Sequence, residues 1–348
     1  MTAPKPPVLT VALPSKGALC DGALQLFAKA NLPIQRSSAK GYIGRLKPLP
    51  SVRVLLQRAT DIPRKLLDGS VHLGVTGLDI LAEEYGGQDL KVLIPNLGFG
   101  DATLVLAVPI EWVDIKDMHD LATLAYNWRA RGRRLRISTK FRNLTEAFLL
   151  RHGITHFEIV ASEGTTELDP KIGVADLIAD LTSTGTALRE NQLKPLVGGS
   201  IFTSTACMVV RPENVRTQEQ ARLMRQIVRT LESTMLAEGL YQIHAYCFAT
   251  ARDTLARELG AFPDDDVRFY TQETVGRDGT PLIKYEVLCK ARRLSDVVKH
   301  LQHNAREVLV NRTDYRFSKD APAIMLLQRM LEGHLRRPAN DDPGEPLA

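Results

Sequence analysis

The residues best suited to do chemistry lie in one stretch of the chain, from Glu163 to Leu188. A short apolar segment ends there in four hydroxyl side chains around one glycine, the hydroxyl loop: Thr182, Ser183, Thr184, Gly185 and Thr186. Glycine permits a tight turn in which N–H groups converge, and hydroxyls donate further hydrogen bonds to phosphate oxygens. A helix expected over residues 187–193 would add a partial positive charge at its start. This order predicts a site for a ribose phosphate.

The carboxylates before the loop strengthen this interpretation. Asp176 and Asp180 lie in the apolar segment, and Glu167 and Gly173 precede it. Carboxylates can accept ribose hydroxyls or hold Mg²⁺. The alternative is a plain surface helix, because Ser and Thr are common helix caps. The acidic residues favour the ligand site.

Composition and charge restrict the class of protein. The chain has 348 residues, 44% of them hydrophobic and 24% charged, as in a soluble protein of two or three domains. It shows no membrane-length apolar run and no apolar signal core, so we expect a cytoplasmic protein without a membrane partner. The four scattered cysteines suggest no zinc site. The net charge of +5 favours anionic ligands, and we expect no nucleic-acid partner because the arginine-rich segment 129–136 lacks interleaved aromatic residues.

Alternating strand and helix patterns predict two α/β lobes up to residue 240. Strands are expected over residues 8–13, 52–56, 71–76, 104–108, 135–139, 157–162, 193–196 and 206–210. Helices are expected over residues 16–30, 62–67, 79–84, 145–152, 168–179 and 217–240. Ligands of open α/β sheets bind at the carboxyl ends of the strands, so we expect the site in a cleft between the lobes.

The last third of the chain predicts a β-α-β-β-α-β order, which is the ferredoxin-like plan. Its strands are expected over residues 243–249, 267–271, 282–288 and 306–310, and its helices over residues 252–259 and 294–303. A further helix is expected over residues 321–335. The proline-rich polar end, RRPANDDPGEPLA, is expected to be disordered.

Ordered motifs over residues 8 to about 240 resemble the ATP phosphoribosyltransferase family, the first enzyme of histidine biosynthesis. The loop region matches the family pattern at Glu167, Gly173, Asp180 and residues 184–186, followed by Leu188. Further matches are residues 13–17, Arg58 with residues 61–63 and Gly69, and residues 74–79, 97–100, 137–141 and 143–145. The chain departs from the pattern at Ala18, His72 and Ala187, where Arg, Asp and Thr are usual.

The resemblance implies a two-lobed fold like that of type II periplasmic-binding proteins, followed by a ferredoxin-like α+β domain. On this plan, residues 1–108 form lobe I, completed by residues 193–240, and residues 109–192 form lobe II. Residues 241–320 form the ferredoxin-like domain, which either senses histidine as an inhibitor or serves only for packing or dimerisation. Residues 321–348 form the terminal helix and tail.

The family joins N1 of ATP to C1 of phosphoribosyl pyrophosphate and releases pyrophosphate, with Mg²⁺ as the cofactor. The resemblance implies that residues 182–186 hold the 5′-phosphate, that Asp176 and Asp180 meet the ribose hydroxyls, and that Glu167 lies nearby. It places Lys16 at the pyrophosphate and the nucleotide at Arg58, Thr76 and Asp79. Each assignment has a structural alternative: a solvated carboxylate for Asp176, a helix cap for Glu167 or Asp79, an exposed side chain for Lys16, and an ion pair with Asp61 for Arg58.

Three functions remain open at this point. The chain is a self-sufficient enzyme, a catalytic subunit that needs a separate synthetase-like regulatory partner, or a non-catalytic two-lobed anion-binding protein. The missing signal peptide and the retained Lys16, Glu167, Asp176 and Asp180 favour an enzyme. The family forms dimers, hexamers or mixed octamers, so we expect a homo-oligomer.

Overall fold

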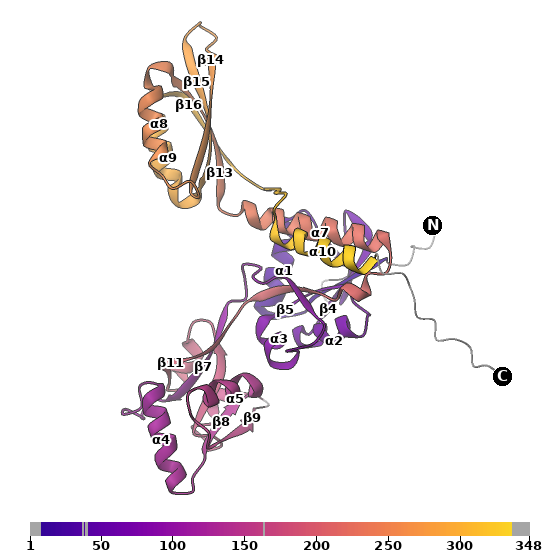
Figure 1. Cartoon of the computed structure of the whole chain (residues 1–348), viewed down its shortest axis with the longest axis vertical. Coiled ribbons are helices and arrows are strands. Elements are labelled where there is room, and N and C mark those ends of the chain that lie inside the picture. Colours follow the sequence, from indigo (N-terminus) through magenta and orange to yellow (C-terminus); the bar gives the residue numbers. More distant parts are fainter. Residues whose placement is uncertain (1–7, 37, 39–40, 163, 336–348) are drawn as a thin grey trace, which may run out of the picture. The chain divides into compact units, whose positions relative to one another are not determined.

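The computed structural model describes residues 8–36, 38, 41–162 and 164–335, and the chain forms two compact units (Figure 1). The C-terminal unit comprises Val228–Pro322, and the N-terminal unit comprises the chain before it together with the chain from Ala323 on, which includes all but the first residue of the helix α10 (Pro322–Leu335). The long helix α7 (Gln218–Ala237) contains the boundary between the units. In the described part of the chain, no helix is long and apolar enough to cross a membrane.

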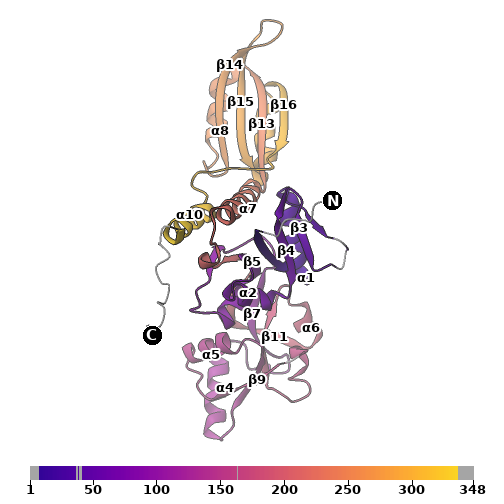
Figure 2. The same ribbon diagram turned by 90° about the vertical axis from the view of Figure 1, so that its right-hand side faces the viewer.

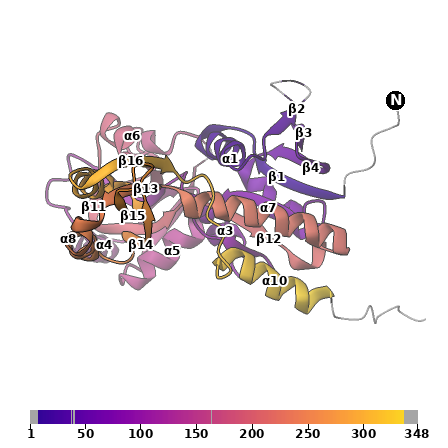
Figure 3. The ribbon, with the colours of Figure 1, turned by 90° about the horizontal axis from the view of Figure 1, so that it is seen from above.

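Lobe I of the N-terminal unit contains a seven-stranded sheet in the order β2-β3-β4-β1-β5-β12-β6. Its strands are β1 (Leu9–Pro14), β2 (Ile34–Arg36), β3 (Ile43–Leu46), β4 (Leu49–Gln57), β5 (Leu73–Gly77), β6 (Lys91–Ile94) and β12 (Ala206–Val210). Its helices are α1 (Gly17–Lys29), α2 (Ile62–Leu67) and α3 (Leu78–Glu84), with a short 3₁₀ helix at Ala59–Asp61. Every residue of β1 and β5 is buried, which explains why the sequence shows apolar runs there without alternation. Figure 3 shows β2 and β3 beside β4 at one edge, two strands that the sequence did not predict.

Lobe II contains a five-stranded sheet in the order β11-β7-β10-β8-β9. Its strands are β7 (Ala102–Pro109), β8 (Leu135–Thr139), β9 (Phe157–Ala161), β10 (Leu177–Thr182) and β11 (Leu193–Ser204). Its helices are α4 (Met118–Ala130), α5 (Arg142–Arg151) and α6 (Thr186–Glu190), with a 3₁₀ helix at Thr166–Leu168. Buried leucines and isoleucines from β7, β8 and β10 pack with α4 and α5 in one core. The two separate α/β sheets confirm the two-lobed, periplasmic-binding-protein-like architecture that the resemblance implied.

Several details of lobe II differ from the sequence-based prediction, including helix α4, which was not predicted. β7 and β11 pair with each other in the second sheet, so lobe II covers residues 102–204 rather than 109–192. The helix predicted over residues 168–179 is wrong: the 3₁₀ helix ends at Leu168, and Leu177 begins a buried strand. Pro170 disfavours a continuous helix there, and Gly173 adopts the left-handed conformation with φ of 76°. The helix predicted over residues 187–193 is the shorter α6, because Leu193 already belongs to β11.

The C-terminal unit has the predicted β-α-β-β-α-β order. Its elements are β13 (Leu240–Phe248), α8 (Arg252–Gly260), β14 (Val267–Val275), β15 (Pro281–Lys290), α9 (Leu294–Gln302) and β16 (Ala305–Arg312). All neighbouring strands pair antiparallel in the order β14-β15-β13-β16, which is the ferredoxin-like arrangement (Figure 2). Alternating residues of β13 and β15 are buried against α8 and α9. The predicted helix over residues 321–335 is present as α10, whereas the tail predicted to be disordered lies beyond the described residues.

Candidate functional site

The carboxyl ends of three parallel strands form what we call the lobe II edge. β8 is parallel to both β9 and β10, so the residues that follow these strands lie at the same edge of the sheet. Lys140 follows β8, Ser162 follows β9, and β10 leads directly into the hydroxyl loop. The loop therefore lies where α/β sheets bind their ligands.

The hydroxyl loop turns at Gly185, whose φ of 71° lies in the left-handed region that favours glycine. The Gly185 N–H donates to Thr182 Oγ1 at 2.9 Å, and the Thr184 hydroxyl donates to Thr186 Oγ1 at 3.0 Å. Ser183, Thr184 and Thr186 are exposed. The loop therefore presents several hydroxyls to solvent on a backbone that is already turned.

Two carboxylates stand beside the loop. Asp180, near the end of β10, is half-buried, and its Oδ1 accepts a hydrogen bond from the Leu181 N–H at 2.9 Å. Burial raises the pKa of Asp180, the negative charge of Glu167 raises it further, and Lys140 opposes the shift. Glu167 lies on the 3₁₀ helix after β9, which is braced by a 2.7 Å hydrogen bond between the Ser162 and Thr166 hydroxyls. The structure thus brings Glu167 close enough to Asp180 to act on its charge.

Asp176 does not join this group, and its assignment to the site is a correction. It lies just before β10, at the end of the strand opposite to the hydroxyl loop. Asp176 is 7% exposed, and its carboxylate is bound by Arg133 at 2.9 Å, by Arg136 at 3.1 Å and by the Arg136 N–H at 2.9 Å. These hydrogen bonds hold the pKa of Asp176 below its ordinary value despite burial. Asp176 is therefore a structural ion-pair residue that fixes the arginine-rich segment, not a ribose ligand.

The carboxyl ends of β1, β4 and β5 form a second group, the lobe I edge. β1 is parallel to both β4 and β5, so Lys16, Arg58 and Asp79 all follow strands at the same edge. Lys16 and Arg58 are exposed. Within the described residues, neither side chain forms an ion pair, so the proposed structural pair of Arg58 with Asp61 is not present. Two cations are therefore available to an anionic ligand here.

The other two residues predicted for the nucleotide are already engaged. Thr76 is fully buried and its hydroxyl donates to the Ala59 carbonyl at 2.9 Å, so it braces the backbone that follows Arg58 and has no surface for a ligand. Asp79 is 9% exposed, and its Oδ1 accepts from the Ser204 hydroxyl at 2.5 Å. Ser204 in turn accepts from the Asp79 N–H at 3.0 Å. The placement of Thr76 at the nucleotide is therefore corrected, and Asp79 ties α3 to the end of β11.

The comparisons with known proteins agree with the motif order. Residues 58–233 match the HisG family, described as ATP phosphoribosyltransferase. The chain is 34% identical over 335 residues to the ATP phosphoribosyltransferase of Rhodopseudomonas palustris strain HaA2, a match that covers 95% of this chain and 99% of the relative. The chain belongs to the ATP phosphoribosyltransferase family.

Other ATP phosphoribosyltransferases match different shares of the chain. That of Mesorhizobium japonicum is 39% identical over 232 residues, which is 66% of this chain and all of the relative. A solved structure entitled ATP phosphoribosyl transferase (HisG:HisZ) complex from Thermotoga maritima covers 65% of this chain and 97% of that chain, with 27% identity and a TM-score of 0.49. The family match ends at residue 233, near the start of the C-terminal unit.

The three departures from the ATP phosphoribosyltransferase pattern have different surroundings. Ala18 and Ala187 are exposed, in the first turns of α1 and α6. His72 is partly buried, and its Nδ1 accepts from the Thr10 N–H at 3.2 Å while its Nε2 lies 3.1 Å from Gln220 Nε2. Burial lowers the pKa of His72. His72 therefore joins the start of β5 to β1 and has a packing role.

Two basic residues of the lobe II edge were missed from the sequence. Arg189, on α6, donates to the Thr184 carbonyl at 3.2 Å and to Thr186 Oγ1 at 3.1 Å, which places a guanidinium on the hydroxyl loop. Lys140 donates to the Gly164 carbonyl at 3.2 Å and acts electrostatically on Asp180. Arg189 follows Gly185 by four residues, one helical turn, and this spacing was a usable signal.

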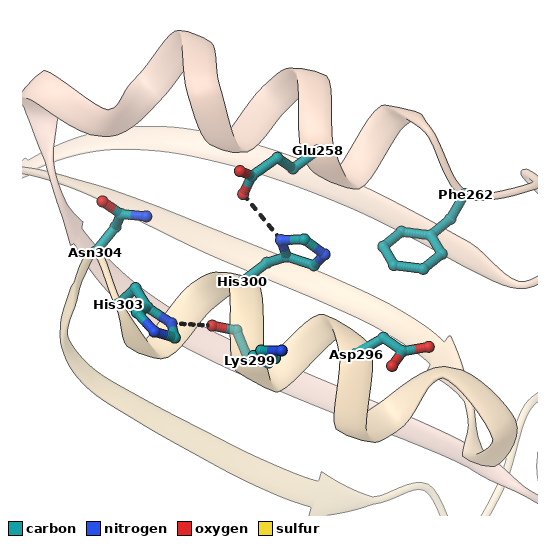
Figure 4. A pocket seen from close by; sticks show the side chains of 7 residues that line it. All are labelled: Glu258, Phe262, Asp296, Lys299, His300, His303 and Asn304. Atoms are coloured by element: carbon teal, nitrogen blue, oxygen red, sulfur yellow. Dashed lines mark hydrogen bonds and ion pairs between the residues drawn. The ribbon is translucent and has the colours of Figure 1, made fainter.

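The C-terminal unit contains a pocket of ≈ 620 Å³ between α8 and α9 (Figure 4). Its lining includes Glu258, Phe262, Asp296, Lys299, His300 and His303. His300 Nδ1 lies 3.0 Å from Glu258 Oε2, and His303 Nδ1 lies 2.6 Å from the Lys299 carbonyl. Across the residues that the structure describes, no group of three or more His, Cys, Asp or Glu side chains could hold a metal ion.

Proposed function

We propose that this chain transfers the phosphoribosyl group of phosphoribosyl pyrophosphate to N1 of ATP at the two edges described above, in the first step of histidine biosynthesis. The observation that carries the proposal is the lobe II edge, where Asp180, Glu167 and the exposed hydroxyl loop meet at the ends of three parallel strands. A phosphorylated ribose needs hydroxyl and N–H donors for its phosphate and carboxylate acceptors for its own hydroxyls. This edge supplies both.

The residues of lobe II would bind and polarise the ribose. Thr184, Thr186 and the turned backbone at Gly185 donate to the 5′-phosphate, and Arg189 adds a positive charge at the same place. Asp180 and Glu167 accept from the ribose hydroxyls. Positive charge develops at C1 as pyrophosphate leaves, and two nearby carboxylates stabilise it more in the transition state than in the ground state.

The residues of lobe I would bind the phosphates and orient ATP. Lys16 and Arg58 are exposed cations at one edge and can neutralise the pyrophosphate or the triphosphate chain. N1 of adenine carries its own lone pair, so the attack needs no general base. Orientation of the two substrates and electrostatic stabilisation are then the main sources of rate acceleration.

The donor set fits a magnesium ion that arrives with the substrate. Mg²⁺ is usually bound by one or two carboxylates together with substrate phosphates, rather than by a cage of protein groups. Glu167 and Asp180 are the two carboxylates described at the lobe II edge, in agreement with this donor chemistry. When bound, the ion would lower the negative charge of the leaving pyrophosphate.

The C-terminal unit is included in the proposal as a regulatory element that binds histidine and lowers turnover. Support comes from its ferredoxin-like arrangement and its position after the family match. The alternative is a packing or dimerisation module, and dependence on a separate regulatory subunit is a further alternative. A homo-oligomer is expected in either case.

The test is an assay of the purified chain with ATP, phosphoribosyl pyrophosphate, Mg²⁺ and pyrophosphatase, with and without histidine. We expect phosphoribosyl-ATP to form and histidine to suppress it. Turnover that is indifferent to histidine would leave the enzyme and remove the regulatory role. Calorimetry with each substrate alone separates the negative results: binding without turnover indicates a missing partner subunit, and the absence of binding rejects the proposed function.

A further inference from the structure

A buried carboxylate of lobe I contacts the first turn of a helix in lobe II. Glu83, in the last turn of α3, is 8% exposed. Its Oε1 accepts from the Asn143 N–H at 2.8 Å, and its Oε2 accepts from the Leu144 N–H at 3.0 Å. The Asn143 side chain returns a hydrogen bond from Nδ2 to the Glu83 carbonyl at 2.8 Å. Three hydrogen bonds therefore join two segments that are 60 residues apart.

Helix α5 needs this contact because it lacks a cap of its own. The residue before the helix is Phe141, which provides no side-chain acceptor. The first N–H groups of a helix have no intrahelical partner, and a negative charge near them is favourable. Glu83 satisfies two of these groups and places its charge at the favourable end of α5.

The same carboxylate lies at the unfavourable end of its own helix. Negative charge near the last carbonyls of α3 opposes the helix dipole, and burial of a carboxylate is costly unless it is hydrogen-bonded. The presence of a buried glutamate at position 83 is therefore not explained by a contribution to the stability of α3. The contact with α5 is what compensates for these costs.

Helix α3 is also fixed at its other end. Asp79, in its first turn, exchanges two hydrogen bonds with Ser204, the last residue of β11. β11 belongs to the sheet of lobe II, so both ends of this seven-residue helix are hydrogen-bonded to lobe II elements. α3 follows β5 at the lobe I edge, and α5 begins two residues after Lys140 of the lobe II edge.

We propose that Glu83 is a positioning residue that fixes the lobe II edge relative to the lobe I edge through the cap of α5. The inference rests on the proposed function, because it assigns one substrate to each edge. Glu83 touches neither substrate. Its loss leaves each edge able to bind its own substrate but lets the reacting atoms drift apart. A misplacement of about 1 Å costs about 100-fold in rate.

The test compares Glu83→Ala and Glu83→Gln with the matched control Glu84→Ala, which removes an exposed carboxylate from the neighbouring position of the same helix. For Glu83→Ala we expect kcat to fall about 100-fold, while the dissociation constant of each substrate measured alone changes less than about threefold. Glu83→Gln keeps one acceptor and one bond, so its kcat should lie between those of wild type and Glu83→Ala. Glu84→Ala should match wild type. A purely structural role would instead weaken substrate binding and thermal stability together with kcat.

A second measurement does not depend on activity. The described cysteines Cys20, Cys207, Cys247 and Cys289 are all buried, so spin labels can be directed to Gln88→Cys in lobe I and Tyr126→Cys in lobe II, both exposed positions. The label-to-label distance distribution should broaden in Glu83→Ala or, if that variant does not fold, in Glu83→Gln. Unchanged distributions in a folded Glu83 variant overturn the inference, as does a kcat within about twofold of wild type. If wild type shows no turnover, the proposed function fails, and the distance measurement still decides whether Glu83 fixes the lobes.

Discussion

Asp176 and Asp180 stand at opposite ends of β10, and the pKa values of their carboxyl groups are shifted in opposite directions. At the start of the strand, two arginines and a backbone N–H bind Asp176, which lowers its pKa. At the end of the strand, Asp180 is half-buried, accepts one hydrogen bond from its neighbour Leu181 and has a raised pKa. A lowered pKa of a carboxyl group means that its ionised form stabilises the folded protein, whereas a raised pKa means that its ionised form costs folding stability. The second kind is the one expected in an active site.

The largest effect that separates the two residues should be on activity. Asp180→Asn keeps the shape of the side chain and removes its charge, so we expect kcat/KM to fall about 100- to 1,000-fold, the range for loss of one electrostatic group. Because the raised pKa means that the ionised form costs stability, the variant should be at least as stable as wild type. Steady-state kinetics measures the fall in kcat/KM, and urea unfolding measures the stability of the variant.

Glu190→Gln, which neutralises an exposed carboxylate on α6, is the control and should change neither quantity. Near-normal kcat/KM for Asp180→Asn would remove the lobe II edge from the catalytic site.

The second prediction is that loss of the Asp176 charge lowers stability and leaves activity unchanged. Asp176→Asn leaves Arg133 and Arg136 without their buried partner. Loss of one member of a buried pair is strongly destabilising, but both arginines are more than a third exposed and solvent screens them. We therefore expect a loss of about 2 kcal/mol in the free energy of unfolding, with kcat/KM unchanged for the folded fraction. A large loss of kcat/KM in fully folded protein would return Asp176 to the site.

This pair of residues also shows what the sequence could and could not predict. The hydroxyl loop, Asp180 and Glu167 lie close together in the chain, so their spacing carried the information. The partners that decide the role of Asp176 are 43 and 40 residues away, and Ser204, which engages Asp79, is 125 residues away. Propensity and spacing contain no information about such contacts, which form only when the sheets assemble.

The same distinction applies to the fold. In the C-terminal unit, alternating apolar residues and short connections predicted every strand and both helices, because one face of the sheet is buried against the helices and the apolar residues of β13 and β15 alternate accordingly. In lobe II, the segment from Leu168 to Ala179 was assigned to a helix, although Leu177–Thr182 is a strand between β7 and β8. A buried central strand has no alternation, so its apolar run is not distinguishable from a buried helix by period alone. Strand β11, at the edge of this sheet, was misplaced for a different reason, since its sheet is decided by its pairing with β7.

The third prediction uses low pH to protonate Asp176 and so remove its stabilising charge. The lowered pKa of Asp176 in the folded state means that its stabilising contribution is present above 3.8, the ordinary value, and is lost as the pH falls through the folded-state pKa. The difference in unfolding free energy between wild type and Asp176→Asn should therefore be full at neutral pH and shrink below 3.8. Urea unfolding of both proteins over this range measures it. A difference independent of pH would mean that packing, not charge, makes Asp176 stabilising.

The fourth prediction concerns the backbone of the loop after Asp180. Gly185→Ala adds a Cβ at a φ of 71° and 3.1 Å from Arg189 Nη1. The strain should cost about 1 kcal/mol of stability, and the displaced guanidinium should raise the KM for phosphoribosyl pyrophosphate while the KM for ATP stays constant. Gly132→Ala, at a φ of 71° with nothing within 4 Å of the added Cβ, is the control for strain alone. Equal kinetics in the two variants would show that neither the loop backbone at Gly185 nor the placement of the Arg189 guanidinium contributes to binding of phosphoribosyl pyrophosphate.

The smallest effect should come from Arg189, a residue outside the motifs recognised in the sequence. Its guanidinium is exposed and its hydrogen bonds go to the loop itself, so water competes for it. Arg189→Gln should therefore raise the KM for phosphoribosyl pyrophosphate only about fivefold, the equivalent of about 1 kcal/mol. The increase should diminish at high salt, because salt screens an exposed charge far more than it affects Asp180. An increase in KM that persists in high salt would mean that Arg189 acts by holding the shape of the hydroxyl loop rather than by its charge. In that case Arg189→Lys, which keeps the charge and loses the two-point contact, would be as impaired as Arg189→Gln.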